Sequence, residues 1–407
     1  CLEAAMDVCP RSSEIPGTLA VAMEQVLEPI ETARGLPNAC YTDAATMEIE
    51  QQRVFKDGWA CVGFALDVPD RGDLFPIEFS GSQLLLTRNT DDVVQVFHNV
   101  CRHRGRILVE ASINSGKSII CPYHSWTYDL DGQLIGTPHI GGAGKHTCPG
   151  FNKNDIGLCK VRSAEWFGLI FVDLSGTAKP FADYIKPLAE RWKVFAEVDL
   201  VDTGADCRIE FELACNWKLA VENYCEAYHL PWVHPELNRY SPLEQHYGIV
   251  HQSYSGQGSR CYEPKFSGDA PAIPNAPNLP PFWDSGAEYV VLFPNVLLGL
   301  HRDHFYAVLI QPDGPCRTRE RMQIYYFDRR VRDHGYHTQR IANRGLWQSI
   351  FVEDRAAVES MQRGRHSIGF DGGIFSPVMD QPTHAFHSWI ARAFLYGRSN
   401  SPVVASS

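Results

Sequence analysis

The sequence lacks three features that would place it in other broad classes of protein. Its longest apolar stretches, such as 166–174, are far shorter than the roughly 20 residues that span a bilayer, so no transmembrane helix is expected. It has no basic surplus: 37 Lys and Arg stand against 48 Asp and Glu, which argues against a broad nucleic-acid-binding surface. It also has no low-complexity block, and its 44% hydrophobic and 21% charged residues exclude disorder for most of the chain.

No positively charged, apolar signal segment follows the first residue, Cys1. Two interpretations of a chain that starts with Cys instead of Met stay open, a trimmed N-terminus and a lipid-modified mature Cys. The thirteen Cys are odd in number and irregular in spacing, which is typical of a reduced intracellular protein in which a few Cys bind a metal. We therefore expect a cytoplasmic protein that binds neither a membrane nor a nucleic acid.

Along the 407 residues the local pattern changes twice. Residues 1–40 are polar and weakly patterned, and 43–55 has the spacing of a helix. Short β-rich runs punctuated by Gly and Asp then continue to about residue 174, which predicts a small all-β domain. The remainder predicts helices over 181–198, 217–231 and 340–364, and antiparallel strands over 208–213, 289–300, 304–310 and 320–327.

We therefore predict an α+β fold in which an all-β domain precedes a larger domain with an antiparallel, helix-grip-like sheet and helices. The expected boundaries are 1–55 for an N-terminal extension and helix, 56–175 for the all-β domain, 176–400 for the larger domain and 401–407 for a flexible tail. The stretch 264–286 contains six Pro and cannot be regular throughout. Two interpretations of this stretch stay open, a lid over a site and an ordinary surface loop.

Two mixed pairs of Cys and His form the sharpest motif of the chain. Cys101-x-His103 is followed, after seventeen residues, by Cys121-x-x-His124. Two such turns facing each other supply two thiolates and two imidazoles, which is the ligand set of a Rieske [2Fe–2S] cluster. A Cys₂His₂ zinc site is the rival interpretation, but zinc sites usually pair Cys with Cys and His with His. The mixed pairs therefore favour the cluster.

His229 and His234, further downstream, form a weak candidate metal site on their spacing alone, because a pair of His at a helix end is more often structural. The two residues are five apart, so an unbroken helix would splay them by roughly 140°. Pro231 lies between them and is expected to break the helix, which lets the imidazoles converge. Two imidazoles and one carboxylate on one face can hold a mononuclear non-haem iron and leave positions open for O₂ and substrate.

With these motifs in place, the chain resembles the catalytic α subunit of the Rieske non-haem iron oxygenases. The resemblance is carried by FHNVCRHRG (97–105), CPYHSWTYDLDG (121–132), NWKLAVENYCEAYHLPWVHP (216–235) and VEDRAAVESMQRG (352–364). It implies that Cys101 and Cys121 bind one iron of the cluster, and that His103 and His124 bind the other.

The resemblance also implies three ligands for a mononuclear iron, namely His229, His234 and Asp354, with Glu353 as the nearest competitor of Asp354. It gives Glu226 the role of a bridge that carries electrons from the cluster of one subunit to the iron of the next. It places Asn223 near that iron.

Two departures from the family pattern bear on the substrate. Many members carry Asp where this chain has Glu226, and Glu resembles the branch that attacks quaternary ammonium compounds such as carnitine or glycine betaine. The segment between Asn223 and Glu226 is one residue shorter than in ring-dihydroxylating dioxygenases. We therefore expect a terminal oxygenase that uses O₂ to hydroxylate or oxidatively N-demethylate a small, betaine-like compound.

The implied cofactors are a Rieske [2Fe–2S] cluster and a mononuclear Fe(II). The chain has no G-x-G-x-x-G after a strand and no C-x₄-C-x₂-C run. NAD(P)H and flavin chemistry is therefore expected on a separate flavin/iron–sulfur reductase, with or without a ferredoxin. Electron transfer between subunits requires a closed ring of subunits. The resemblance implies that this ring is a homotrimer, with or without an additional β subunit.

Three alternatives remain open on the sequence. They are an aromatic ring-hydroxylating dioxygenase α subunit, a Rieske electron-transfer protein without oxygenase activity, and a zinc-stabilised binding module. Aromatic residues near the motifs can cage a quaternary ammonium by cation–π attraction or flank a planar ring. These residues are Trp232, Phe293, Phe305, Trp347 and Phe351.

Overall fold

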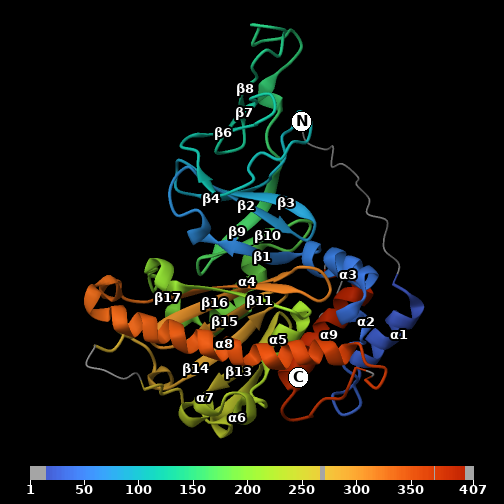
Figure 1. The fold of residues 1–407 in the computed structure, drawn as a ribbon, viewed down its shortest axis with the longest axis vertical. Helices are drawn as coiled ribbons and strands as arrows, with labels where there is room; N and C mark the ends of the chain where they lie inside the picture. The colour runs from blue at the N-terminus through green and yellow to red at the C-terminus, as the bar shows by residue number, and fades with distance from the viewer. Residues whose placement is uncertain (1–14, 266–270, 371, 399–407) are drawn as a thin grey trace.

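The computed structural model describes residues 15–265, 271–370 and 372–398, so Cys1 and the expected tail at 401–407 lie outside the described residues. Figure 1 shows an elongated molecule with two parts along its longest axis, a narrow β-rich part above and a broader part below in which helices cover a sheet. The predicted α+β class with antiparallel sheets is confirmed. The described helices include none that is long and apolar enough to cross a membrane.

Between residue 15, where the described part begins, and the first strand, the structure has four helical segments, where the sequence predicts only one. They are α1 (Gly17–Val26), α2 (Ala39–Thr42), α3 (Ala44–Glu50) and a π-helical turn (Gln51–Lys56). The expected helix over 43–55 corresponds to α3 and the π turn, and Asp43 caps its start by accepting the N–H of Thr46 at 2.9 Å. Helix α1 was not expected, although its buried residues Leu19, Met23 and Val26 recur every three or four positions.

The upper part contains a seven-stranded sheet and a three-stranded sheet. The larger sheet has the order β1 (Trp59–Phe64), β10 (Leu169–Asp173), β9 (Lys160–Trp166), β4 (Val94–His98), β3 (Ser82–Arg88), β2 (Asp73–Phe79) and β5 (Ile113–Asn114). The smaller sheet has the order β6 (Ser118–Ile120), β7 (Thr127–Asp129) and β8 (Leu134–Gly136). The Cys101 motif follows β4 and the Cys121 motif follows β6, so both lie in loops at this end of the molecule.

The lower part is built on one seven-stranded antiparallel sheet. Its order is β11 (Arg208–Leu213), β17 (Thr318–Tyr326), β16 (His304–Pro312), β15 (Val296–Leu300), β14 (Ala287–Leu292), β13 (Tyr254–Ser259) and β12 (His246–Val250). The single strand expected over 289–300 is wrong, because β14 and β15 form a hairpin whose turn contains Pro294. Pro has no N–H for a strand ladder and so belongs in that turn.

The helices that complete the lower part are α4 (Phe181–Arg191), α5 (Trp217–Cys225), α6 (Leu230–Val233), α7 (Pro235–Tyr240), α8 (His337–Arg365) and α9 (Gln381–Tyr396). Helix α8 confirms the long helix predicted over 340–364, and in Figure 1 it crosses in front of the sheet. Helix α9 was not expected. The described part of 264–286 is irregular apart from a 3₁₀ turn at Pro281–Asp284. Strand β10 ends before the expected domain boundary at residue 175 and α4 begins after it, and that boundary stays a prediction.

The helix expected over 217–231 is shorter than predicted, and the reason assigned to Pro231 is wrong. Helix α5 ends at Cys225, and Glu226 is extended. Pro231 stands in the first turn of α6, where a missing N–H costs nothing. The chain therefore breaks at Glu226, between α5 and α6, and His229 and His234 flank α6 at its two ends.

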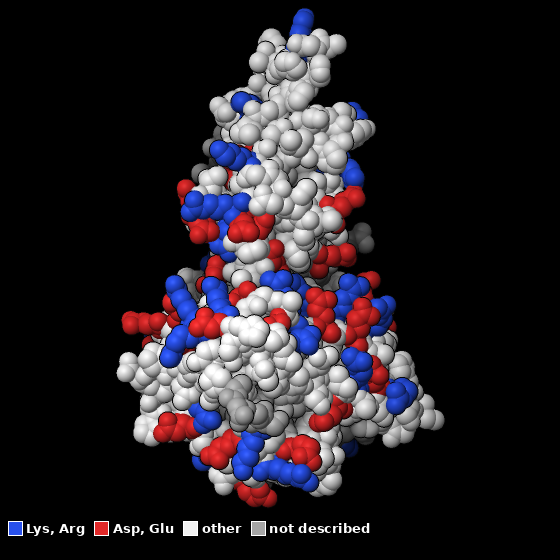
Figure 2. All heavy atoms as spheres, turned by 60° about the vertical axis from the view of Figure 1, so that its left-hand side comes forward, with Lys and Arg blue, Asp and Glu red and all other residues white. Residues whose placement is uncertain are grey.

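Both faces of the lower sheet are buried, which explains its continuous apolar runs. In β16, Phe305, Ala307 and Leu309 face a core shared with β1, β10 and α4, while the alternate residues face a core shared with α5, α8 and α9. The sheet is therefore the middle layer, and its helix-covered face carries the candidate iron site. Figure 2 shows basic and acidic side chains interspersed over the outer face that it presents.

A buried ion pair ties the N-terminal helices to the helix that leads into the candidate iron site. Nζ of Lys218 lies 2.7 and 2.9 Å from the two carboxylate oxygens of Glu50, and both side chains are almost fully buried. Trp217 Nε1–H donates to the same carboxylate at 2.9 Å. Burial raises the pKa of Glu50, and Lys218 counteracts that rise.

We expect Lys218→Met to lower the melting temperature strongly, because it leaves the Glu50 carboxylate buried without its counter-ion. Breaking a buried pair in this way costs about 3–5 kcal/mol. Thermal unfolding followed by circular dichroism measures the effect, with Lys186→Met, an exposed Lys on α4, as the matched control. Equal melting temperatures for the two variants would contradict a structural role for the pair.

Candidate metal centres

The two Cys/His loops of the upper part have the same backbone geometry. The N–H of Cys101 donates to the carbonyl of Arg106 at 2.8 Å, and the N–H of Gly105 donates back to the carbonyl of Cys101 at 3.0 Å. The loop that starts at Cys121 repeats both bonds with the residues four and five positions further on. Gly105 and Ser125 occupy the same place in their loops, each with positive φ.

These two loops bring the four predicted ligands to one place. The rings of His103 and His124 lie 4.7 Å apart between centroids. Both thiols are buried, and burial together with the adjacent Cys101 thiol raises the pKa of Cys121. Nδ1 of His124 is buried and has no hydrogen-bond partner among the described residues. Two sulfurs and two imidazoles with one nitrogen left unpaired fit a [2Fe–2S] cluster that takes two Cys and two His.

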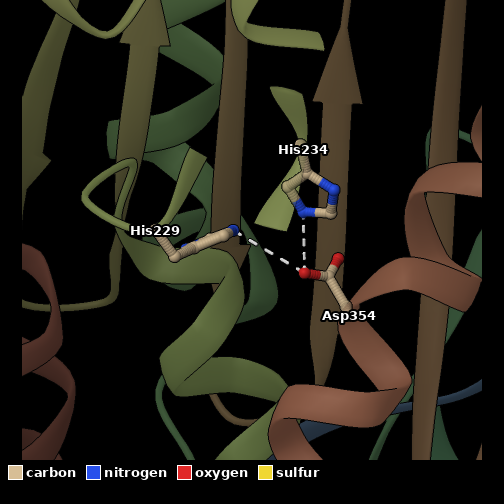
Figure 3. Close-up of side chains that lie close together, drawn as sticks. All are labelled: His229, His234 and Asp354. Atoms are coloured by element: carbon tan, nitrogen blue, oxygen red, sulfur yellow. Dashed lines mark hydrogen bonds and ion pairs between the residues drawn. The ribbon is translucent and has the colours of Figure 1, made fainter. Parts of the chain in front are cut away.

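The second candidate centre joins residues that lie about 120 positions apart in the sequence. The carboxylate Oδ1 of Asp354 on α8 lies 2.8 Å from Nε2 of His234 and 3.6 Å from Nε2 of His229 (Figure 3). The three ligand atoms lie within 4.8 Å of one another. Two imidazoles and one carboxylate fit a mononuclear iron with open positions.

Two further carboxylates fix the orientation of the imidazoles. Nδ1 of His229 lies 2.6 Å from Glu226, and Nδ1 of His234 lies 2.7 Å from Glu353. Because a carboxylate only accepts hydrogen bonds, each Nδ1 carries the proton and each Nε2 is turned towards Asp354. Burial lowers the pKa of His234, but the bonds to Asp354 and Glu353 outweigh burial and raise it. The site therefore favours a cation between the imidazole and the carboxylates.

Glu226 also shapes the backbone that carries His229. Its Oε2 accepts the N–H groups of Tyr228 and His229, so the side chain caps the turn that leads into α6. Its own carbonyl accepts from Nε2 of Gln257 at 2.9 Å. Oε1 of Gln257 in turn lies 2.6 Å from Nδ1 of His246, a supporting contact that the sequence reasoning missed.

A small cavity of about 50 Å³ opens beside the three candidate ligands. Asn223 lines it together with His229 and Asp354, and its place near an iron stays a prediction. Its aromatic lining comes from the sheet and from α5 and α8. These residues are Tyr224, Tyr289, Tyr306, Trp347 and Phe351.

Three of the five aromatic residues proposed as a cage lie elsewhere. Trp232 is 72% exposed on α6. Phe293 packs against Phe386 of α9, and Phe305 faces the opposite side of the sheet from the site. Sequence proximity to a motif identified Trp347 and Phe351, whereas Tyr289 and Tyr306 come from strands and could have been found only from strand alternation.

Two family models match the two parts of the chain. The family model described as "Ring hydroxylating alpha subunit (catalytic domain)" matches residues 189–395, just over half of the chain. The chain belongs to this family. The model of the Rieske [2Fe–2S] domain matches residues 58–147, which contain both Cys/His loops. The protein is therefore a Rieske non-haem iron oxygenase with a Rieske cluster and a mononuclear iron, and a separate reductase supplies its electrons.

Full-length relatives share both parts of this oxygenase. It is 28% identical to choline monooxygenase of Arabidopsis thaliana over 88% of this chain and 82% of the relative. It is 24% identical to the glycine betaine monooxygenase oxygenase subunit of Chromohalobacter salexigens over 97% and 94%. The crystal structure of the quaternary ammonium Rieske monooxygenase CntA with an inhibitor aligns with a TM-score of 0.75 at 22% identity, over 93% of this chain and 99% of that one, which shows a shared fold.

Removing the hydroxyl group of Tyr128 is expected to lower the reduction potential of the Rieske cluster. The Tyr128 oxygen lies 3.3 Å from Sγ of Cys101 and accepts the N–H of Arg102 at 3.1 Å, and burial raises its pKa, so it keeps its proton and can donate to the sulfur. Hydrogen bonds to cluster sulfur raise the potential. A redox titration of Tyr128→Phe should give a lower value than Tyr123→Phe, which changes an exposed ring beside His124. Equal potentials would show that Tyr128 does not act on the cluster.

Replacing Glu226 by Ala is expected to weaken Fe(II) binding at the mononuclear site about 10- to 100-fold, because His229 loses the partner that orients it. Glu226→Gln keeps an acceptor oxygen for Nδ1 and should lose less. Titration of Fe(II) into protein stripped of its mononuclear iron measures both. Glu236→Ala is the matched control, since Glu236 is exposed on α7 and pairs only with Arg239. Unchanged affinity in Glu226→Ala would contradict the orienting role.

Proposed function

We propose that this oxygenase inserts one oxygen atom from O₂ into a C–H bond of a small quaternary ammonium or betaine-like compound. The observation that carries the proposal is the aromatic lining of the cavity beside His229, His234 and Asp354. Ring faces attract a quaternary ammonium that is desolvated between them. The names of the choline and glycine betaine monooxygenases to which the chain is similar support the same substrate class.

We assign the cluster to Cys101, His103, Cys121 and His124, and the mononuclear iron to His229, His234 and Asp354. The cluster supplies one electron at a time, and the iron supplies a site for O₂ reduction beside the substrate. Two electrons and two protons balance the reaction: one oxygen atom enters the C–H bond and the other leaves as water.

The chain's own side chains prepare the site for this chemistry. Glu226 and Glu353 hold the Nδ1 protons of the two imidazoles, so each Nε2 stays available as a ligand. Tyr306 and Trp347 enclose one side of the cavity, with ring centroids 4.4 Å apart, and exclude bulk water from it.

We further propose that electrons pass between subunits in a head-to-tail homotrimer through Glu226. Figure 1 draws the small sheet of the cluster loops near one end of the molecule and α6 near the other, so the two centres of a single chain lie far apart. His103 is exposed at the first end, and Tyr228 and Trp232 are exposed beside Glu226 at the second. Head-to-tail contacts between such unlike surfaces close into a ring. A ferredoxin, a β subunit and a cytoplasmic location remain predictions.

An aromatic ring is the second candidate substrate. The family description names ring hydroxylation, and the same aromatic cavity can flank a planar ring as well as an ammonium group. The two candidates differ in charge, which makes them separable by experiment.

We expect choline to bind the reduced oxygenase about 2- to 30-fold more tightly than 3,3-dimethylbutan-1-ol, in which carbon replaces the charged nitrogen. Calorimetric titration of both compounds measures this ratio, since they differ chiefly in charge. A single turnover of the chemically reduced protein with O₂ should then oxidise choline and leave toluene unchanged. Equal binding of the two isosteres together with oxidation of toluene would replace the ammonium proposal with ring hydroxylation.

A further inference from the structure

A wall of buried rings separates the small cavity beside His229 from a second, larger cavity. The larger cavity, of about 600 Å³, is lined in part by Tyr262 and His304. The small cavity is lined on this side by Tyr289 and Trp347. Nε1 of Trp347 donates to Nε2 of His304 at 2.9 Å, so the two cavities are separated by side chains in direct contact.

Four polar atoms in this wall have no hydrogen-bond partner within the described ranges 15–265, 271–370 and 372–398. They are the phenolic oxygens of Tyr262 and Tyr289 and both ring nitrogens of His301. The three side chains are buried, and the His301 ring lies 4.5 Å from that of Tyr262 and 5.4 Å from that of Tyr289. Buried polar groups are rarely left unpaired, because each loses its hydrogen bonds to water. Four such atoms in one cluster indicate a partner from outside the chain.

The chemistry of these atoms selects the kind of partner. Burial raises the pKa of both phenols, so each keeps an O–H that can donate. Burial, together with the charges of His304 and Arg302, holds the pKa of His301 well below its usual value, so its neutral ring has one donor and one acceptor. The two phenolic O–H groups and the imidazole N–H supply three donors, which suit an oxygen that accepts hydrogen bonds, as in a carboxylate group. The phenolic oxygens and the second ring nitrogen can also accept, so a hydroxyl group fits as well.

Charges on either side of the wall orient a ligand that carries both an ammonium and an oxygen. Asp354 lies at the end of the small cavity that holds the candidate iron ligands, and Glu353 and Glu226 lie just behind those ligands. Arg302 and Lys265 line the larger cavity beyond the wall, together with the one carboxylate of Asp303, so its charged lining is positive on balance. Even with Fe(II) held at the Asp354 end of the small cavity, the three carboxylates outnumber its two charges, so a positive group is favoured towards that end and an electron-rich oxygen towards the wall.

We propose that Tyr262, Tyr289 and His301 form a subsite that binds the oxygen-bearing end of the substrate while its ammonium end lies beside Asp354. The subsite binds a hydroxyl or carboxylate oxygen through the two phenolic O–H groups and the imidazole N–H. It rests on the proposed function, because it assumes that the cavity beside His229 receives a quaternary ammonium compound.

The test compares three ligands by calorimetric titration of the holoenzyme and of its Tyr262→Phe and Tyr289→Phe variants. Glycine betaine carries a carboxylate, choline carries a hydroxyl, and tetramethylammonium has no oxygen. Loss of a hydrogen bond to a charged group should weaken glycine betaine roughly tenfold or more in each variant, with a smaller loss for choline. Tetramethylammonium should bind the variants as it binds the wild type. The larger of the two affinity losses, for glycine betaine or for choline, shows whether the subsite prefers a carboxylate or a hydroxyl group.

The melting temperature of the ligand-free variants provides the second readout. Tyr262→Phe and Tyr289→Phe remove a hydroxyl without a partner and should not lower it. Tyr184→Phe is the matched control and should lower it, because the Tyr184 hydroxyl donates to the carbonyl of Phe293 at 2.8 Å in another part of the core.

Three results would overturn the subsite. An equal loss of affinity for all three ligands in the variants would show that Tyr262 and Tyr289 contribute only to packing. A fall in melting temperature as large as that of Tyr184→Phe would show that their hydroxyls already have partners in the protein. Failure of every ligand to bind the wild type would contradict the proposed function itself and remove the subsite with it, which distinguishes the two failures.

Discussion

The candidate iron site depends on carboxylates that hold the far nitrogens of two imidazoles. Glu226 and Glu353 each accept the Nδ1 proton of one His, which turns both Nε2 atoms towards Asp354. Without these acceptors each ring could rotate or exchange its tautomer, and the three ligand atoms would no longer be directed at one metal position. Glu226 combines this contact with a backbone role, since it lies where α5 ends and caps the turn before α6. One side chain therefore fixes both the path of the chain and the orientation of the ring.

The lower sheet places that site because both of its faces are buried. Alternate residues of β16 pack against the upper part on one side and against the long helices on the other. The helix-covered face supplies Tyr289 and Tyr306, and α8 supplies Trp347, Phe351 and Asp354 from one stretch of helix. The cluster loops lie at the far end of the molecule (Figure 1). That separation within one chain is the structural reason for proposing transfer between subunits.

Most of what could be predicted from the sequence came from the spacing of residues within short motifs. The mixed Cys/His pairs pointed to the cluster site, whereas the family pattern singled out His229, His234 and Asp354 for the second centre. The orienting role of Glu353 was not predictable, because its contact with His234 joins residues 119 positions apart. The hairpin within 289–300 was missed because strands buried on both faces lose the alternation that marks strand ends. Pro231 was misread because Pro starts helices as readily as it ends them.

The central claim is that one chain holds two iron centres of different kinds. The direct measurement is the content of iron and acid-labile sulfide per chain, together with the electron paramagnetic resonance spectrum of the dithionite-reduced protein. The account predicts about three iron and two sulfide per chain with a Rieske-type signal, two iron in the cluster and one at the His229 site. Zinc without sulfide, in a colourless protein, would contradict it.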